Sequence, residues 1–390
     1  MALPPKNNVA RAKDAYRVML VDDSAVIRGL FTRTLEADPE IEIIASVGDG
    51  QMAINALKKK PDVEVIVLDI EMPRMDGLTA LPHLIEIDPK AAVIIASTLS
   101  TKNAEISLKA MDLGAKDYIP KPSTSRELSG SEEFKRELLE KIKTFAKERR
   151  QKENKPLPSK ASFSIERKAA ERENRFAKPT LSSVATSEIK LRPMGVKPPK
   201  AIAIGSSTGG PQALFQVLGK IPKTIGLPIL LTQHMPATFT PVLADHITRS
   251  TGWTCVEGVD GMRVEAGQVI LAPGDKHMLI EESAGSFRVR LNQDPPENFC
   301  RPAVDPMLRS MIKAWRGHVL CVILTGMGSD GAKASAQLVD AGGTVIAQDE
   351  ASSVVWGMPG AVARAGVCSA VMPVSEIGDW VGRQTVRWAA

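Results

Sequence analysis

The feature that most constrains the fold of this chain is the regular alternation of short apolar runs with helical patterns. In the first third of the chain the apolar runs are Val18–Val21, Ile41–Val47, Val63–Leu68, Ala92–Ala96 and Tyr118–Ile119. Helical patterns fill the gaps between them, for example Val26–Leu35 and Leu78–Ile87. Short buried strands joined by helical crossovers are typical of a parallel sheet with helices on both faces. This order therefore predicts a doubly wound α/β domain.

A second series of strand signals begins at residue 201. Its apolar runs are Ala201–Ile204, Ile229–Thr232, Val269–Ala272, Val319–Leu324 and Thr344–Ala347. Helical patterns lie between them, as at Ala303–Trp315 and Ala332–Ala341. A chain of 390 residues is also long for a single hydrophobic core. We therefore expect a second doubly wound α/β domain.

The segment between the two series is basic and contains few large apolar residues. From residue 141 to 200 it holds 17 Lys and Arg against 6 Asp and Glu, whereas the whole chain has a net charge of only +5. The positive charge thus belongs to one segment and not to a face of either domain. We interpret this segment as a solvated tether; binding to nucleic acid or to a membrane surface is the alternative.

Domain boundaries follow from these changes in composition. Phe134, Leu138, Leu139, Ile142 and Phe145 are spaced for one face of a helix that closes the first domain. We expect an N-terminal extension at 1–15, a first domain at 16–146, a basic flexible linker at 147–198 with transient helix at 166–175, and a second domain at 199–390.

The composition also predicts where the protein works. No run of 18 apolar residues occurs, so we expect no membrane insertion, and Met1–Lys13 lacks the apolar core of a signal peptide. The four cysteines form no CxxC pair, which favours reduced thiols. A cytoplasmic protein is the expectation.

Polar side chains gather at one edge of the first predicted sheet. Asp22 and Asp23 follow its first strand, Asp69 ends the third, Ser97 ends the fourth and Lys121 follows the fifth. The C-terminal ends of parallel strands share one edge, where ligands bind. Three carboxylates that meet there favour a hard divalent cation such as Mg²⁺.

These residues resemble the receiver domains of two-component response regulators, which have a flavodoxin-like fold. The matching motifs are Val21–Ser24, Leu68–Gly77 and Lys121-Pro122. The resemblance implies that Asp69 accepts a phosphoryl group from a histidine kinase. It also implies Mg²⁺ held by Asp22, Asp23, Asp69 and the Glu71 carbonyl, a phosphate contact from Lys121, switch movements of Ser97 and Tyr118, and a cis Lys121-Pro122 bond.

A glycine-rich turn, Gly205–Gly210, joins the first strand of the second series to a helix. Its Gly-x-Ser-x-Gly spacing favours Ser207 as an acyl-transfer nucleophile, next to amide donors at a helix N-terminus. A phosphate-binding turn is the alternative. The dinucleotide and Walker spacings are both absent from it.

A serine nucleophile needs a base, and the chain has five histidines. His234 directly follows the strand signal that ends at Gln233, and this position puts it on the same edge as Ser207. His277 also follows a strand and is the alternative.

The orienting carboxylate should lie on the same edge, and Asp330 is favoured because it lies in the tight exit turn of a buried strand. Asp275 and Asp305 are alternatives, and Asp330 also fits the N-cap of the helix from Ala332. Glycines around Met327 let the Met327 amide approach an oxyanion.

The C-terminal domain as a whole closely resembles chemotaxis protein-glutamate methylesterases, which have a Rossmann-like α/β/α fold. The matching motifs are Ala203–Gly210, Thr232–Pro236, Ala272–Met278, Arg301–Asp305, Ile323–Gly331 and Ala347–Ser352. The resemblance implies Ser207 as nucleophile, His234 as base, Asp330 as orienting acid, Met327 N–H in the oxyanion hole and Thr208 in a positioning role. The sequence departs from the family at Ser206, which often is alanine, and in its longer, more basic linker.

What this resemblance implies is a phosphorylation-activated esterase acting on methylated chemoreceptors, with glutamine deamidation through the same acyl-enzyme and no metal at the serine. The unphosphorylated receiver is expected to cover the active-site edge. Two other hypotheses are a regulator that binds a phosphorylated ligand at the serine turn and one that binds nucleic acid through the linker.

Overall fold

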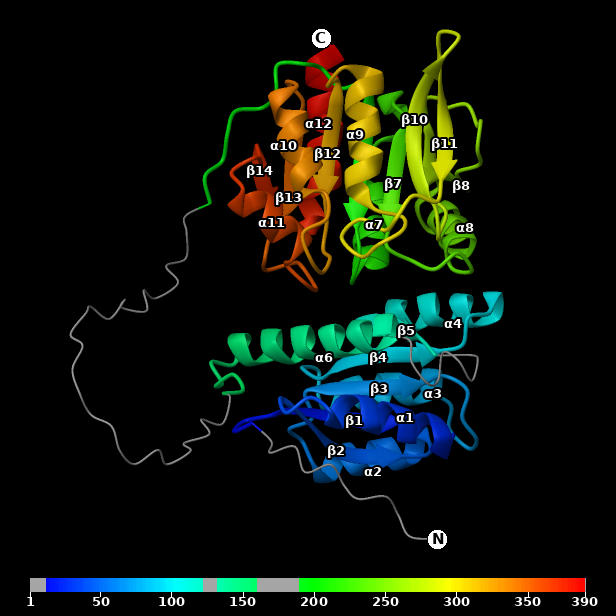
Figure 1. Ribbon diagram of the computed structural model, residues 1–390, viewed down its shortest axis with the longest axis vertical. Coiled ribbons are helices and arrows are strands. Elements are labelled where there is room, and N and C mark those ends of the chain that lie inside the picture. Colours follow the sequence, from blue (N-terminus) through cyan, green and yellow to red (C-terminus); the bar gives the residue numbers. More distant parts are fainter. Residues whose placement is uncertain (1–11, 122–131, 160–188, 390) are drawn as a thin grey trace, which may run out of the picture.

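The computed structural model describes residues 12–121, 132–159 and 189–389, which form two α/β domains placed end to end (Figure 1). Three sequence-based expectations lie outside the described residues: the structure of 1–11, the isomer of the Lys121-Pro122 bond and the helix at 166–175. Among the described residues, no helix is both long and apolar enough to cross a bilayer.

The N-terminal domain is the predicted doubly wound sheet. Its five strands pair in parallel in the order β2-β1-β3-β4-β5. The strands are β1 (Tyr16–Val21), β2 (Ile41–Val47), β3 (Val65–Asp69), β4 (Ala92–Ser97) and β5 (Asp117–Pro120). The helices are α1 (Ala25–Glu36), α2 (Gly50–Lys59), α3 (Gly77–Ile87), α4 (Thr101–Asp112) and α6 (Glu132–Lys152).

Two helical layers cover this sheet. One core cluster joins the sheet to Phe31 and Leu35 of α1 and to Leu138 and Ile142 of α6. The opposite face packs against α2, α3 and α4. The apolar face predicted for the helix after residue 134 is thereby confirmed.

The helix α6 continues past residue 147, where the sequence predicted a flexible linker to begin. Arg150 near its end is buried; it donates to the Glu64 carboxylate and to the carbonyls of Asp14 and Ala15. A buried guanidinium needs such partners to offset its lost hydration. The first basic residues of the expected linker are therefore structural parts of the N-terminal domain.

The C-terminal domain is a second parallel sheet, of seven strands in the order β14-β13-β12-β6-β7-β9-β8. The strands are β6 (Ala201–Ser206), β7 (Ile229–Gln233), β8 (Thr254–Glu257), β9 (Gln268–Leu271), β12 (Val319–Ile323), β13 (Thr344–Gln348) and β14 (Ala370–Met372). The helices are α7 (Gly210–Lys220), η1 (Lys223–Ile225), α8 (Thr240–Thr251), α9 (Val304–Trp315), α10 (Ala332–Asp340), α11 (Met358–Arg364) and α12 (Val374–Ala389).

Helices α7, α8 and α12 pack on one face of this sheet, and α9, α10 and α11 on the other. An antiparallel hairpin, β10 (His277–Ser283) with β11 (Ser286–Asn292), packs beside α9. The hairpin and the edge strands β8 and β14 were not predicted, because they alternate polar and apolar residues or are only three or four residues long.

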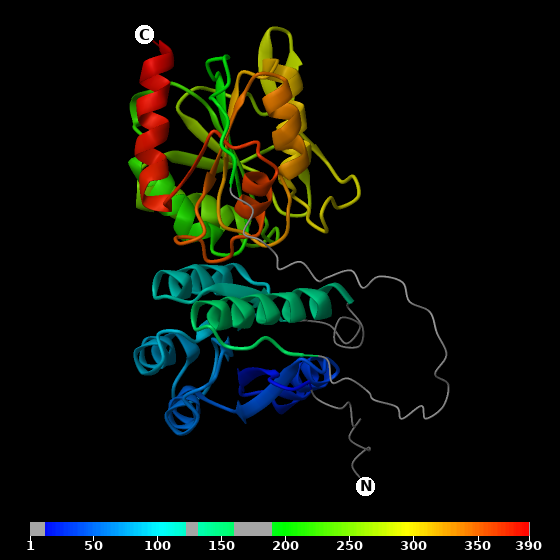
Figure 2. The same ribbon diagram turned by 90° about the vertical axis from the view of Figure 1, so that its left-hand side faces the viewer.

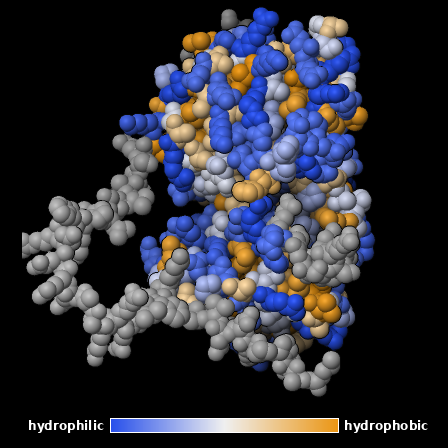
Figure 3. All heavy atoms as spheres, viewed as in Figure 1, coloured by the Kyte–Doolittle hydropathy of each residue, from blue (hydrophilic) through white to orange (hydrophobic). Residues whose placement is uncertain are grey.

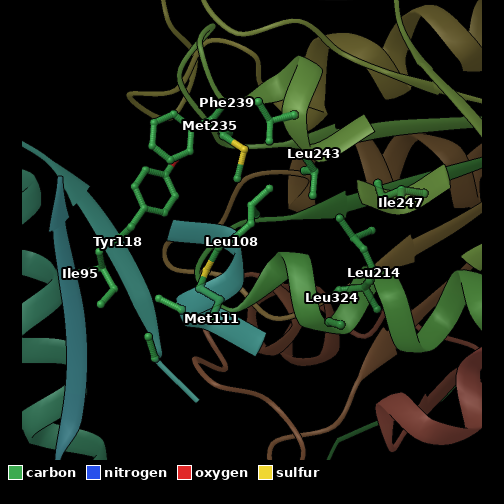
Figure 4. Packing of buried hydrophobic residues seen from close by; sticks show 14 of the residues in the cluster. Ile95, Leu108, Met111, Tyr118, Leu214, Met235, Phe239, Leu243, Ile247 and Leu324 are labelled. Atoms are coloured by element: carbon green, nitrogen blue, oxygen red, sulfur yellow. The ribbon is translucent and has the colours of Figure 1, made fainter. Parts of the chain in front are cut away.

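The two domains meet through α4, β5 and α6 on one side and the C-terminal edge of the second sheet on the other (Figures 1 and 2). Tyr118 of β5 stacks on Phe239, with ring centroids 4.6 Å apart. Leu108 and Met111 of α4 belong to the same buried cluster as Leu214 of α7 (Figure 4). The junction residues Leu108, Met111, Tyr118, Leu214 and Phe239 are all buried. The face seen in Figure 3 mixes hydrophilic residues with smaller apolar patches on both domains.

Arg150→Ala should destabilise the N-terminal domain by about 3–5 kcal/mol, since it leaves the buried Glu64 carboxylate without its cationic partner. Circular dichroism during urea unfolding measures this loss. Tryptophan fluorescence reports the C-terminal domain, because all five tryptophans follow residue 250. The exposed Lys147→Ala is the matched control on the same helix; equal stability of the two variants would contradict the structural role of Arg150.

Candidate active site and phosphorylation site

Ser207 and His234 lie at neighbouring strand ends in the middle of the C-terminal sheet. Ser206 of β6 pairs with Gln233 of β7, so the next residue of each strand emerges on the same edge. The His234 N–H donates to the Ser206 carbonyl over 3.2 Å, which ties the two strand ends together. The chain leaves β6 toward β7 on one side and later returns to β12 on the other. The two residues thus lie where ligands bind in sheets of this kind.

The serine turn is held by close backbone packing. Gly209 has φ +73°, a conformation that is unfavourable for residues with a Cβ, and it precedes α7 directly. Gly326 lies so near that a Cβ there would come 2.8 Å from Ser207 Cβ. The Ser207 N–H donates to the Thr325 carbonyl over 3.0 Å. These contacts fix the direction in which the Ser207 side chain leaves the turn.

The structure brings His234 and Asp330 together. The Nε2 atom of His234 lies 2.8 Å from Asp330 Oδ2, and Asp330 is buried. The Val304 and Asp305 N–H groups at the start of α9 also donate to the Asp330 carboxylate. Burial raises the pKa of Asp330, but the hydrogen bonds from His234 and these amides outweigh it and hold the pKa below its usual value.

Cys300 is the second titratable neighbour of His234. Burial lowers the pKa of the imidazole, whereas the electrostatic effect of Cys300 and the hydrogen bond with Asp330 raise it, so that the net pKa of His234 is about 10. The other three cysteines are buried and all four are free, in agreement with the expected reduced thiols. Cys300 itself is half-buried, because it lies beside the catalytic candidate and not in a core.

The alternatives to His234 and Asp330 have other partners. His277 Nδ1 accepts the Ala303 N–H, so its Nε2–H donates to the Pro295 carbonyl, and the ring is buried. Asp275 bonds the Arg301 guanidinium. Asp305 accepts the Ala334 N–H of α10.

Asp330 is not the N-cap of α10, the helix that begins at Ala332, as one interpretation of the sequence had it. The N-cap of α10 is Gly331, without a side-chain cap bond. Asp330 instead binds the N-terminus of α9, while Asp305 from α9 binds the first turn of α10.

Within the described residues, no hydrogen bond joins Ser207 Oγ directly to the His234 ring. Because Asp330 takes Nε2, the ring nitrogen that remains for the serine is Nδ1. The backbones of the two residues are adjacent, because Ser206 and Gln233 pair at the ends of β6 and β7.

The residues next to the serine contact the N-terminal domain. The Thr208 hydroxyl donates to Asp117 Oδ2 over 2.9 Å, and Lys141 of α6 lies 3.1 Å from the same oxygen. The Thr144 hydroxyl of α6 lies 3.5 Å from Met327 Sδ. Thr208 and Met327, the two residues with predicted supporting roles, are therefore both held by the other domain.

The predicted carboxylate cluster assembles at the edge of the N-terminal sheet. Oxygens of Asp22, Asp23 and Asp69 lie within 4.8 Å of one another. Lys121 Nζ lies 2.6 Å from both Asp22 and Asp69. Burial raises the pKa of Asp69 to about 6, against the opposing effect of Lys121. Three carboxylates so close together, with a lysine beside them, fit the oxygen preference of Mg²⁺.

The other predicted residues of this site are spread around it. Ser97 is buried and its hydroxyl lies 3.0 Å from that of Ser107. The Glu71 N–H donates to Asp69 Oδ1 over 3.3 Å, while its side chain pairs with Lys102. Tyr118 is not directed at the carboxylates; it is buried against the other domain.

Sequence reasoning missed the residues that brace the serine turn. Gln233 accepts from the Ser206 hydroxyl and donates to the Ser207 carbonyl. The Thr325 hydroxyl donates to the Thr208 carbonyl over 2.9 Å. Both residues end or directly follow predicted strands at the edge where Ser207 lies. This position in the sequence could have identified them as neighbours of the serine.

Comparison with known proteins finds relatives of both parts of the chain. The family model described as CheB methylesterase matches residues 202–381, and the one described as response regulator receiver domain matches residues 18–131. The protein-glutamate methylesterase/protein-glutamine glutaminase of the group 2 operon of Rhodospirillum centenum is 54% identical over 97% of this chain and 96% of its own length. A protein-glutamate methylesterase/protein-glutamine glutaminase of Azospirillum brasilense is 54% identical over 97% and 95%.

Two solved structures from Thermotoga maritima match one domain each. The CheB methylesterase catalytic domain is 38% identical, with a TM-score of 0.47, and covers 48% of this chain and 98% of its own. The response regulator domain of CheB is 33% identical, with a TM-score of 0.30, and covers 34% and 97%.

Gly326→Ala should destabilise the C-terminal domain by about 1–3 kcal/mol, because the added Cβ meets Ser207 and Met358 Sδ at less than contact distance. Tryptophan fluorescence during urea unfolding measures the change. Gly219→Ala, at an exposed helical glycine with no neighbour within 4 Å of the new Cβ, is the control and should not destabilise. Tolerance of both substitutions would refute the tight packing of the turn.

Proposed function

Because the chain belongs to the family of CheB methylesterases with an N-terminal receiver domain, we propose that it hydrolyses glutamate γ-methyl esters of chemoreceptors when phosphorylated. Relatives that share about half of its residues over nearly the whole length carry the names of both this esterase and a protein-glutamine glutaminase. The observation that carries the proposal is the buried His234–Asp330 pair beside the turn that presents Ser207.

Ser207 is the nucleophile of this proposal and His234 is its base. Nδ1 of His234 takes the proton of Ser207 as Oγ attacks the ester carbonyl. Asp330 holds the opposite nitrogen, Nε2, and stabilises the imidazolium that forms. Its depressed pKa supports this role, since the carboxyl remains ionised at neutral pH.

An oxyanion develops on the ester oxygen as the tetrahedral intermediate forms. The Met327 N–H has no acceptor among the described residues and lies in the glycine-rich segment that packs against Ser207, which supports a role as oxyanion donor. Methanol leaves with the proton from His234, and water then releases the glutamate. With a glutamine amide the leaving group is ammonia, so deamidation follows the same route.

Asp69 is the phosphoryl acceptor of the proposal, and a histidine kinase is the donor. Lys121, already bonded to Asp69, pairs with the transferred phosphoryl oxygens. Asp22, Asp23, Asp69 and the Glu71 carbonyl would hold Mg²⁺, which neutralises charge on the transferring group. Ser97, the last residue of β4, would move to bond the phosphate.

The unphosphorylated receiver would restrain the esterase by direct contact. Asp117 binds Thr208, next to the nucleophile, and Tyr118 stacks on Phe239 at the start of α8. Both receiver residues lie on β5, a few residues before Lys121. A change at the phosphorylation site that moves this strand would weaken both contacts and shift the population toward an open form.

Ser207→Ala should abolish methanol release from methylated receptors and leave phosphorylation of Asp69 unchanged. The two activities belong to different domains, so loss of methanol release with normal phosphorylation would identify Ser207 as the nucleophile. Methanol is assayed by isotope release, and phosphorylation by uptake from a labelled kinase. The neighbouring Ser206→Ala is the control, because its hydroxyl is fully buried and bonded to Gln233; methanol release that survives in Ser207→Ala would reject the nucleophile.

Tyr118→Ala should raise the methylesterase activity of the unphosphorylated protein. Burial of a large apolar side chain contributes about 1.5–3 kcal/mol, so its loss increases a minor open form roughly tenfold or more. The measurement is methanol release without phosphodonor. Val26→Ala on the exposed side of α1 should leave the basal rate unchanged; a basal rate that stays low in Tyr118→Ala would argue against restraint through this contact.

A further inference from the structure

Asn298 lies between two buried carboxylates of the active site. Its side-chain nitrogen donates to Asp330 Oδ1 over 2.9 Å and to Asp305 Oδ2 over 3.1 Å. An amide NH₂ group carries two hydrogens and no charge, so a single nitrogen can bond both carboxylates at once. Both acids are almost completely buried, which makes an unpartnered oxygen on either of them costly.

The two oxygens of Asp330 have separate sets of partners. Oδ2 bonds His234 Nε2 and the Val304 N–H, whereas Oδ1 accepts from Asn298 and from the Asp305 and Gly331 amides. Among the described partners, Asn298 is the only side chain other than His234. The bonds to Oδ1 fix the rotation of the carboxyl group and thereby direct Oδ2 at the imidazole.

The backbone around Asn298 is a tight turn. Asn298 and Phe299 have φ +51° and +65°, and Glu297 and Cys300 exchange two backbone hydrogen bonds across them. Asn is one of the few residues that adopt this left-handed conformation readily. The turn thus holds the Asn298 backbone in the conformation from which its amide reaches both acids.

We propose that Asn298 is a positioning residue of the esterase, which keeps Asp330 in the orientation that His234 requires. This inference rests on the triad proposed above. No other kind of side chain of this length places two neutral donors between two carboxylates. Asp in its place would add a third negative charge, and Ser would offer a single hydrogen.

Asn298→Gly tests the amide separately from the backbone, because glycine adopts the same positive φ without strain. In the full-length protein, with a small-molecule phosphodonor and Mg²⁺, kcat for methanol release should fall roughly ten- to a hundredfold with KM little changed, as expected for loss of a hydrogen bond to a charged group. Asn154→Gly is the matched control, since Asn154 has the same φ of +51° and is exposed in the other domain. A wild-type kcat in Asn298→Gly overturns the proposal.

A double-mutant cycle with Asp330→Asn distinguishes positioning from a general structural effect. If Asn298 acts through Asp330, Asn298→Gly lowers kcat much less in the Asp330→Asn background than in the wild type. Equal losses in both backgrounds overturn the proposal. A wild-type rate in Asp330→Asn alone would refute the triad itself, which is a different failure.

Asn298→Asp keeps the shape of the side chain and serves as a second test should the glycine variant unfold. Two neighbouring carboxylates disfavour the ionised form of the new carboxyl group, and a protonated carboxyl offers one hydrogen where the amide offers two. The kcat for methanol release should therefore stay below the wild-type value across the pH profile. A wild-type kcat in Asn298→Asp overturns the proposal.

Discussion

The candidate active site depends on a buried carboxylate, Asp330, held at the N-terminus of α9. Two backbone amides of that helix donate to it, and the positive end of the helix dipole favours its charge. In return, Asp305 from α9 accepts the Ala334 N–H at the start of α10. Asp330, which precedes α10 in the chain, thus accepts hydrogen bonds from the first amides of α9. Asp305, in the first turn of α9, accepts one from the first turn of α10. The exchange locks α9, α10 and the exit turn of β12 into one unit, against which His234 is oriented.

The junction between the domains also depends on a few residues that have partners on both sides. Lys121, which pairs with the proposed phosphoryl acceptor Asp69 of β3, directly follows β5, the strand that contacts the esterase domain. Lys121 reaches Asp69 at one end, while Asp117 and Tyr118 reach Thr208 and Phe239 at the other. Under the proposed function, a small movement at the phosphorylated edge would reach the serine side directly, because so few residues separate the two ends.

Much of the fold and many candidate residues could be predicted from the sequence. Continuous apolar runs such as Ile229–Thr232 become buried central strands because both faces of a doubly wound sheet are covered. Ser207, His234 and Asp330 were selected because each follows such a strand, and the C-terminal ends of parallel strands share an edge. The prediction was wrong where charge was taken as a sign of flexibility: Arg150 is basic but buried, since Glu64 and two carbonyls compensate it.

The sequence by itself determined where apolar runs alternate with helical patterns, and this alternation determined the two parallel sheets. It also determined which polar residues follow the strands and collect at one edge of each sheet. Only the tertiary structure shows that His234 pairs with Asp330, whereas the ring of His277 is bonded to the Ala303 and Pro295 backbone. It also decided that Asn298 lies between two acids and that Tyr118 packs on Phe239. Such contacts join residues far apart in the chain, and no local pattern of polarity records which distant atom completes a hydrogen bond.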